Sequence, residues 1–539
     1  MLKNKTYLLP LLLAVALAAG IFIGGKLNFN DTPEKLFSTN SKKDKLNRLI
    51  DYIDYEYVDD VNTDSIVDVT VNNILDKLDP HSVYIPKAQQ AKVAENMKGD
   101  FVGVGISFYM YRDSLAVIRP IEGGPSIKAG IKAGDRILTA NLDTLYGRNL
   151  TSQEVVNTLK GDNKTKLKLS VYRPSEDKIL EFNIKRAEVP LKSVDAFYML
   201  GDNFGYIKIN RFAESTYREF KTALETLQKK GMTKLALDLR NNPGGYLGIA
   251  EQIADEFLED DKLILFTKNK SGAIDKAFAS SKGDFEDGEI YVLINEKSAS
   301  ASEIVAGAIQ DNDRGTIIGR RSFGKGLVQR EMSLGDGSSV RLTVSRYYTP
   351  TGRSIQRSYE NGTKDYYNQF YKRYENGELF SADSIKVADS LIFRTPKGKI
   401  VYGGGGIIPD VFVPLESSQE AAWVNTLLQS GFMSFFSFEY LDNHRTKFAA
   451  ISEEDFIENI EVDDETVDSF IYYAEDRGLK IDLNPYRENL KLHIKSTFAE
   501  QLYGNNAQQE ILKLNDPMLE ALIHVDDVDT IEDFVSEEE

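Results

Sequence analysis

Cysteine is absent from this 539-residue chain, and its absence removes several kinds of chemistry at once. No disulfide, no thiolate metal site and no lipid-modified N-terminal cysteine can form. Even if the protein is exported, its fold must be held together by packing alone.

Positive charge and histidine are also scarce. Lys and Arg number 65 against 83 Asp and Glu, and the resulting net charge of -18 opposes phosphate backbones, which argues against nucleic acid as a partner. The segment richest in candidate catalytic side chains is Asn295–Gln329, and it lies far in sequence from the four histidines, His81, His444, His493 and His524. A Ser-His-Asp triad there would need a histidine from a distant part of the sequence, and no motif near the segment indicates one.

One uncharged stretch, Tyr7–Gly25, follows Lys3 and Lys5 and is about long enough to cross a bilayer as a helix. It is either a signal peptide or a membrane anchor. Small residues near Ala16 suit a cleavage site, but the apolar run continues through Ile23, which favours a retained anchor. We therefore expect a location in the bacterial cell envelope, on the periplasmic side of the inner membrane.

The length predicts three or four folded units, and changes in sequence pattern suggest where they begin. The expected fold class is multidomain α+β. Its parts are a signal or anchor segment (1–30), a helical N-terminal region (31–95), a β-rich module of five strands with a late helix (96–188), an α/β layer (189–415) and a helical, acidic C-terminal extension (416–539).

Three serines lie where the α/β layer predicts a strand-to-helix turn. The strand is E-I-Y-V-L-I-N, the helix is A-S-E-I-V-A-G-A-I-Q, and the turn carries Ser298, Ser300 and Ser302. Unpaired N–H groups at a helix start can stabilise an oxyanion, by roughly 3 to 4 kcal/mol per donor. The simpler alternative is a capping box, Ser300-x-x-Glu303. Taken alone, the turn fits capping better than catalysis.

Lys325, between Gly324 and Gly326, changes that balance. Glycine on both sides leaves room to press the amine into a confined site. A lysine base needs its pKa lowered by roughly three units, which burial can supply. Gln329 is placed to orient the amine, although residues four apart on a regular strand lie about 13 Å from each other. The chain must therefore bend at Gly326, or both side chains must converge on the serine.

An alternative nucleophile is Ser322, because Ser322-x-x-Lys325 matches the S-x-x-K motif of penicillin-recognising enzymes. That motif works when a helix places both residues on one face. Here glycines bracket the lysine, and neither S-D-N nor K-T-G is present, so we do not favour this reading.

The motifs together resemble those of carboxy-terminal processing proteases, also called tail-specific proteases, over about residues 45–415. The matching segments are L-D-P-H-S-V-Y-I-P (78–86), F-V-G-V-G-I (101–106), G-P-S-x2-A-G-I-K-A-G-D-R-I (124–137), D-L-R-N-N-P-G-G (238–245), S-A-S-A-S-E (298–303), F-G-K-G-x2-Q (323–329), Y-T-P-T-G-R-S-I-Q (348–356) and G-I-I-P-D (406–410). The resemblance implies a serine-lysine peptidase in 189–415, with nucleophile Ser300, base Lys325 and orienting partner Gln329. It implies oxyanion donors at the Ala301 amide and at either Gly244 or Gly245.

By the same resemblance, residues 96–188 form a PDZ-like domain that selects apolar or unstructured C-terminal tails of protein substrates. Its tail-binding amides would come from Val102, Gly103, Val104, Gly105 and Ile106. No metal, nucleotide or other cofactor is implied. A homo-oligomer or a regulatory partner is a further expectation, with contacts from the N-terminal helices or the acidic extension. The competing interpretation is a scaffold protein on this fold with a silent site.

Overall fold

The computed structural model describes residue 14 and residues 41–527. The predicted membrane segment Tyr7–Gly25 lies, apart from residue 14, outside the described residues. Within the described part of the chain, no helix is long and apolar enough to cross a membrane. The chain divides into two compact units, Met1–Ile74 and Leu75–Glu539.

The first unit contains helices α2 (Ser41–Glu56) and α3 (Thr63–Leu75), the latter ending at the start of the second unit. Both lie in the region that the sequence predicts to be helical, residues 31–95. Several of these apolar side chains are exposed, among them Leu49, Tyr52, Tyr55 and Val69. The described part of this unit therefore leaves apolar surface uncovered.

A β-rich module follows strand β1 (Val83–Ile85) and helix α4 (Lys87–Lys98). Its antiparallel sheet has the order β3-β4-β5-β7-β8, with β6 on β5, and β2 pairs with β9 beside it. The strands are β2 (Asp100–Gly103), β3 (Ile106–Tyr111), β4 (Ser114–Pro120), β5 (Arg136–Ala140), β6 (Asp143–Thr144), β7 (Lys166–Arg173), β8 (Lys178–Lys185) and β9 (Ala187–Pro190); the helices are α5 (Pro125–Ala129) and α6 (Ser152–Leu159). The predicted late helix, α6, begins at the capping box of Thr151 and Glu154.

The α/β layer is built on a six-stranded sheet of order β10-β11-β12-β15-β16-β21, parallel from β11 onward. The elements are β10 (Val194–Met199), β11 (Phe204–Ile209), α7 (Thr216–Lys229), β12 (Lys234–Asp238), α8 (Leu247–Asp255), β15 (Glu289–Ile294), α9 (Ala301–Asp311), β16 (Thr316–Gly319) and β21 (Val411–Phe412). Strand residues alternate between two cores: Leu235 and Leu237 pack with the helices α7, α8 and α9, and Ala236 faces the opposite side.

A second, antiparallel sheet stands beside the helices. Its order is β1-β18-β13-β14, with β17 also on β18. The strands are β13 (Leu263–Asn269), β14 (Ile274–Phe278), β17 (Leu327–Ser333) and β18 (Ser339–Tyr348). Between β18 and β21, an insertion forms helix α10 (Thr363–Glu375) and the hairpin of β19 (Ile392–Arg394) and β20 (Ile400–Tyr402).

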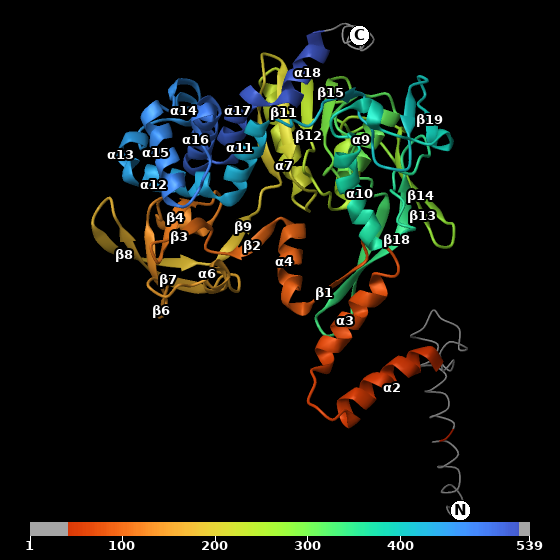
Figure 1. Cartoon of the computed structure of the whole chain (residues 1–539), viewed down its shortest axis with the longest axis horizontal. Coiled ribbons are helices and arrows are strands. Elements are labelled where there is room, and N and C mark those ends of the chain that lie inside the picture. The colour runs from red at the N-terminus through yellow and green to blue at the C-terminus, as the bar shows by residue number, and fades with distance from the viewer. Residues whose placement is uncertain (1–13, 15–40, 528–539) are drawn as a thin grey trace, which may run out of the picture. The chain divides into compact units, whose positions relative to one another are not determined.

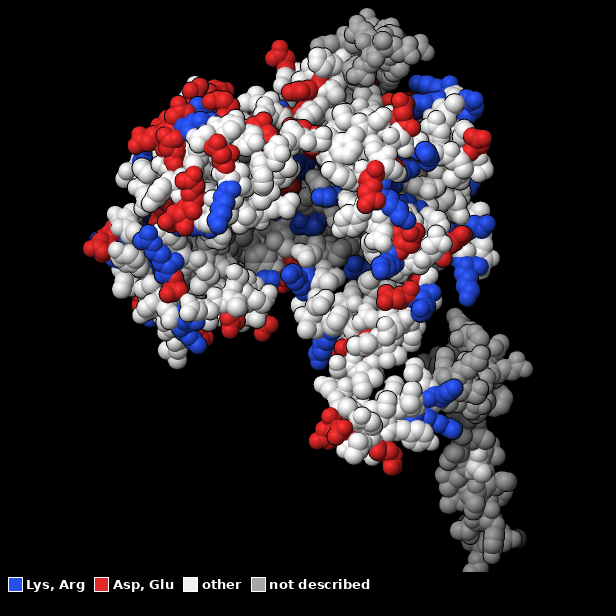
Figure 2. Space-filling model, in the orientation of Figure 1, with Lys and Arg blue, Asp and Glu red and all other residues white. Residues whose placement is uncertain are grey.

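The C-terminal extension is helical, as predicted. Its helices are α11 (Gln419–Ser430), α12 (Phe432–Asn443), α13 (Arg445–Phe448), α14 (Glu453–Asn459), α15 (Asp464–Asp476), α16 (Arg487–Leu502), α17 (Asn505–Leu512) and α18 (Pro517–Asp527). Helices α11 to α17 share one core, while α18 packs on the free face of the six-stranded sheet (Figure 1). Acidic side chains gather over the upper left of Figure 2, where these helices lie.

Candidate active site

Ser300 is the residue at which the chain turns from β15 into α9. Its φ of 55° lies in the left-handed region, where a non-glycine residue is strained. The neighbouring serines are buried and engaged: the Ser298 hydroxyl donates to the Leu239 carbonyl at 2.8 Å, and the Ser302 hydroxyl donates to the Asn242 carbonyl at 3.0 Å. Ser300 is only half-buried and faces a cavity. Of the three serines in the turn, Ser300 is therefore the one that lines the cavity.

That cavity has a volume of about 550 Å³ and brings together six of the predicted site residues. They are Ser300, Ala301, Lys325, Gln329, Gly244 and Gly245. Much of the remaining wall is apolar, with contributions from α4, α8 and α9 such as Met97, Leu247 and Ile304. A hydroxyl, an amine and an extended apolar surface therefore share one confined space.

The Lys325 ammonium donates a 2.9 Å hydrogen bond to Oε1 of Gln329. The distance expected for residues four apart on a strand does not apply, because Lys325 precedes β17 and the strand is irregular between Val328 and Gln329. The amide nitrogen of Gln329 donates to the backbone carbonyl of His81. This second bond fixes the orientation of the amide, so that its oxygen faces the lysine.

The surroundings of Lys325 shift its protonation equilibrium toward the neutral amine. Burial lowers its pKa below the ordinary value of 10.5, and the positive charge of Arg341 lowers the pKa further, against the opposite effects of Glu303 and Asp79. The neutral form is the one that can accept a proton from a serine hydroxyl.

Glu303 connects the turn at Ser300 to the loop of residues 321–326, which carries Lys325 and is called the lysine loop below. Its fully buried carboxylate accepts four hydrogen bonds, from the amides of Ser300 (2.8 Å), Gly324 (2.6 Å) and Lys325 (2.9 Å) and from the hydroxyl of Ser322 (2.6 Å). The bond from the Ser300 amide is one half of the predicted capping box. Burial raises the pKa of Glu303, while these hydrogen bonds lower it. Our sequence reasoning considered Glu303 only as a cap, because its second role depends on a loop 20 residues further along the chain.

The bonding of Ser322 argues against the rival S-x-x-K interpretation. Its fully buried hydroxyl donates to Glu303 and accepts from the Ile407 amide at 2.6 Å. It also lies in a loop rather than on a helix shared with Lys325. A hydroxyl with both partners inside the protein is not placed to attack a substrate.

Tyr347 makes a second connection between the two loops. Its buried hydroxyl lies 3.2 Å from the Ser300 carbonyl and 2.9 Å from the Lys325 carbonyl, and it donates toward both. The sequence offered no signal for this role, because β18 reads as an ordinary strand.

His81 is close to the lysine loop although it is distant in sequence. Its ring lies 6.2 Å from that of Phe323 between ring centres, and its Nε2 is 2.8 Å from the Tyr366 hydroxyl. Burial, followed by the charge of Lys325, lowers the pKa of His81 to about 4. The residues that line the Ser300 cavity do not include it. His81 thus supports Gln329 through its carbonyl. The basic side chains that line the cavity with Ser300 are those of Lys325 and Arg341, and only the lysine has its amine held by Gln329.

The two candidate oxyanion glycines differ in their bonding. The Gly244 amide donates to Oδ1 of Asn242 at 2.9 Å, whereas the Gly245 amide has no acceptor among the residues 41–527. A side chain on Gly244, whose φ is 97°, would lie 2.8 Å from the Ser300 Cβ, so this backbone can approach the serine only as glycine.

The predicted tail-binding segment falls into three parts. Val102 and Gly103 pair with β9, and Ile106 begins β3. Between them, the amides of Val104 and Gly105 have no acceptor within the described structure, and Gly105 has a φ of 75°. Two adjacent free N–H groups at a glycine turn are suited to a carboxylate.

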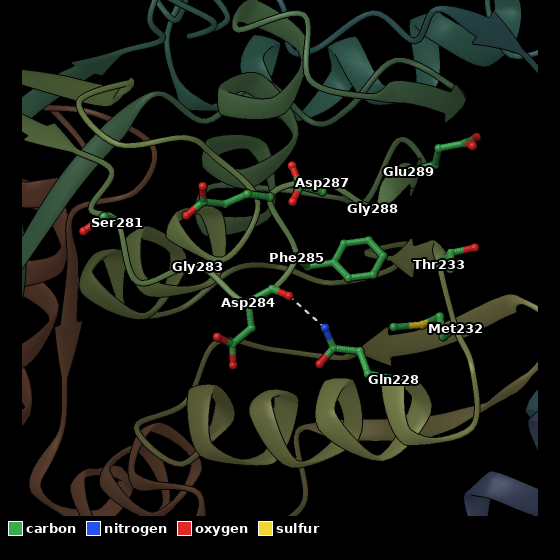
Figure 3. Close-up of a pocket in the computed structure, with 11 residues that line it drawn as sticks. Gln228, Met232, Thr233, Ser281, Gly283, Asp284, Phe285, Asp287, Gly288 and Glu289 are labelled. Atoms are coloured by element: carbon green, nitrogen blue, oxygen red, sulfur yellow. Dashed lines mark hydrogen bonds between the residues drawn. The ribbon is translucent and has the colours of Figure 1, made fainter.

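A second cavity, of about 580 Å³, lies away from these residues and is shown in Figure 3. Its wall includes the acidic residues Asp284, Glu286, Asp287 and Glu289, and Gln228 closes one side through a 2.8 Å bond to the Asp284 carbonyl. It shares no residue with the Ser300 cavity.

Comparisons with known proteins agree with this architecture. Residues 203–365 match peptidase family S41, residues 102–185 match a PDZ domain, and residues 423–504 match a family of unknown function (DUF8443). The carboxy-terminal processing protease CtpB of Bacillus subtilis (strain 168) is 32% identical over 351 residues, which are 63% of this chain and 72% of the relative. A carboxy-terminal-processing protease of Bartonella bacilliformis is 36% identical over 349 residues, 63% of this chain and 79% of the relative.

Among solved structures, a photosystem II D1 C-terminal processing protease is 28% identical, with a TM-score of 0.34 over 58% of this chain and 83% of that chain. The two family matches and the curated relatives define a serine-type peptidase that carries a PDZ domain. The chain belongs to peptidase family S41, with the carboxy-terminal processing proteases. The family resemblance predicted from its motifs is confirmed.

Proposed function

We propose that the protein is an endopeptidase that works through a Ser300–Lys325 acyl-enzyme mechanism. The neutral Lys325 amine accepts the hydroxyl proton as Ser300 Oγ bonds to the substrate carbonyl carbon. The resulting ammonium gives the proton to the leaving amine as the C–N bond breaks. A water molecule, activated by the same amine, then hydrolyses the ester and restores the serine.

The observation that carries this proposal is the shared cavity, in which Gln329 holds the amine of Lys325 and burial lowers the pKa of the amine. For the oxyanion we favour the amides of Ala301 and Gly245. Both residues line the cavity, while the Gly244 amide is already bonded to Asn242.

The decisive experiment is cleavage of a loosely folded test protein with an apolar C-terminus. The unmutated protein is compared with Ser300→Ala and Lys325→Ala, each shown to be folded by circular dichroism. We expect cleavage to be lost in both variants. No cleavage by the unmutated protein, with tail binding intact, would instead favour the catalytically silent scaffold.

We propose further that the PDZ domain captures apolar or unstructured C-terminal tails of substrate proteins. The free amides of Val104 and Gly105 support this role. Amidation removes the terminal charge and is expected to abolish binding of a tail peptide. Unchanged affinity for the amidated peptide would overturn tail recognition.

For location, we propose the periplasmic side of the bacterial inner membrane, with Tyr7–Gly25 as an anchor. Its length, its lack of charge and the lysines before it support this proposal. Fractionation with an antibody to the C-terminal region is the test, because release into the soluble periplasmic fraction would contradict an anchor.

Self-association through the first unit is a related proposal. The exposed apolar side chains of α2 and α3 are its support. Chemical cross-linking of the purified protein should then capture oligomers, and a finding of monomers alone would remove the proposal.

A further inference from the structure

The PDZ domain and the C-terminal helices share a cavity of about 470 Å³ that the proposed mechanism does not use. One wall is the end of strand β3, with Met110 and Tyr111. The other consists of helices α12 and α15, which contribute Phe435 and Tyr473. In Figure 1 helix α12 lies next to β3 and β4 of the PDZ sheet.

The contact between the two modules is well packed, which makes the cavity a built feature of the fold. Phe438 of α12 is buried against the PDZ residues Ala116 and Ile118, and it lies edge-on to the ring of Tyr111. Asp442 adds an ion pair with the largely buried Arg136. The wall from the C-terminal helices is therefore held in a fixed place beside β3.

Three polar side chains of the cavity are paired with one another, while Arg112 lies over the Tyr111 ring and the Ser430 hydroxyl donates to the Leu427 carbonyl at 2.9 Å. The Glu439 carboxylate accepts from the Tyr473 hydroxyl at 3.2 Å and from Arg477 at 3.3 Å, and the Arg477 guanidinium lies 3.5 Å from the centre of the Tyr473 ring. Aromatic surface remains available to a ligand, notably Phe435, whose side chain is 43% exposed. Such a lining suits an aromatic or large apolar side chain.

The position of the cavity along β3 identifies the ligand. β3 is the edge strand of the PDZ sheet, and in the described residues its second edge is unpaired. A peptide whose carboxylate binds at Val104 and Gly105 has its C-terminus at the start of β3, so it must run antiparallel to the strand. Ile106–Tyr111 covers five residue steps. The residue beside Tyr111 is then about the sixth from the peptide's C-terminus.

We propose that this cavity is a second recognition site for substrate tails. It takes an aromatic or large apolar side chain about five to seven residues upstream of the substrate's carboxylate. The C-terminal helical module, which matches a family of unknown function, thereby lengthens the sequence that the PDZ domain reads. The inference rests on the tail recognition proposed above.

Peptide binding tests the inference directly. The full-length Ser300→Ala protein, which cannot turn over a peptide by the proposed mechanism, is titrated with labelled ten-residue peptides that share one apolar C-terminus. Phe replaces Ala at the fifth, sixth or seventh position from the end. We expect one of these peptides to bind about tenfold more tightly than the all-Ala peptide, as measured by fluorescence anisotropy.

Two single substitutions test whether the gain in affinity from Phe depends on the cavity. In the Ser300→Ala background, Phe435→Ala should abolish the gain from Phe, whereas Tyr472→Ala, which removes a 72% exposed ring next to Tyr473, should preserve it. If Phe435→Ala does not fold, Phe435→Leu makes the same test by removing only the aromatic ring. A gain that persists without the Phe435 ring, or equal affinity for all peptides, would overturn the inference.

Amidated peptides separate the two proposals. If amidation abolishes binding while Phe adds nothing, tail recognition stands and the second site is wrong. If amidated and free peptides bind equally, the proposal that the PDZ domain recognises C-terminal tails is wrong. The proposal of a second site, which depends on it, is then wrong as well.

Discussion

Four hydrogen bonds converge on the carboxylate of Glu303, and they connect the backbone at the nucleophile to the backbone at the base. A buried carboxylate is costly unless its hydrogen-bonding capacity is used. Here the donors come from both loops, so the same bonds that satisfy the carboxylate also set the position of Lys325 relative to Ser300.

Glu303→Gln is expected to weaken both fold and activity. An amide keeps the shape but places an N–H group opposite at least one donor, which should lower the free energy of unfolding by roughly 1 to 3 kcal/mol. Thermal unfolding and cleavage rate measure the two effects. Glu225→Gln, on the exposed face of α7, is the control and should leave both unchanged.

Burial is the main cause of the lowered pKa of Lys325, and the positive charge of Arg341 lowers that pKa further. Removing its positive charge should raise the pKa of Lys325, because that charge disfavours the ammonium. Activity requires the neutral amine and therefore rises with pH. For Arg341→Gln we expect the rising limb of kcat/KM to move to higher pH, by on the order of half a unit.

The pH–rate profile is the measurement for Arg341. Arg346→Gln, on the same strand but exposed, should leave the limb in place. If the rising limb of the kcat/KM profile stays at the same pH in Arg341→Gln, then that limb reports the ionisation of a group other than Lys325.

At the scale of elements, helix α10 supports the loop that carries Lys325 through contacts with Phe323 and with the 79–82 turn. The Tyr366 hydroxyl is bonded to His81, and the Tyr367 hydroxyl donates to the Pro80 carbonyl at 2.9 Å. These bonds hold the 79–82 turn, whose His81 carbonyl orients Gln329. An insertion that carries no catalytic group thus contributes to the geometry of the base.

Tyr366→Phe should lower kcat by about two- to tenfold, the effect of losing one hydrogen bond that positions a reacting group. The side chain keeps its ring contact with His81, so the fold should survive. Steady-state kinetics make the comparison, with Tyr371→Phe on an exposed position of the same helix as the control. Equal kcat values in the two variants would show that the turn is held by other contacts.

At the scale of the whole molecule, the end of the chain completes the core of the peptidase. Helix α18 buries Met518, Leu519 and Leu522 on the face of the six-stranded sheet opposite α7, α8 and α9. Arg240 adds an ion pair with Asp516 just before this helix. The C-terminal extension is therefore part of the catalytic fold, besides its contact with the PDZ domain.

Leu522→Ala should destabilise the peptidase by about 2 to 5 kcal/mol, because it opens a cavity at a fully buried position. Ile523→Ala changes a half-exposed neighbour on the same helix and should cost much less. Chemical denaturation of the two variants measures the difference. Similar losses would mean that α18 is not packed on the sheet.

The sequence by itself determined the local parts of this protein. Strand and helix periodicity located most elements of the α/β layer, and motif order identified the family and singled out Ser300, Lys325 and Gln329. Periodicity and motifs are properties of neighbouring residues, so they can be read without a fold. They did not identify the roles of Glu303, Tyr347 or His81, since each acts on residues about 20 or more positions away.

Only the tertiary structure decided which groups meet. It placed the Lys325 amine on Gln329, where strand β17 is irregular between Val328 and Gln329, and it paired the Gly244 amide with Asn242. It also set α12 and α18 against two different domains. These contacts depend on how whole elements pack, and packing is fixed by the summed burial of many residues rather than by any local pattern.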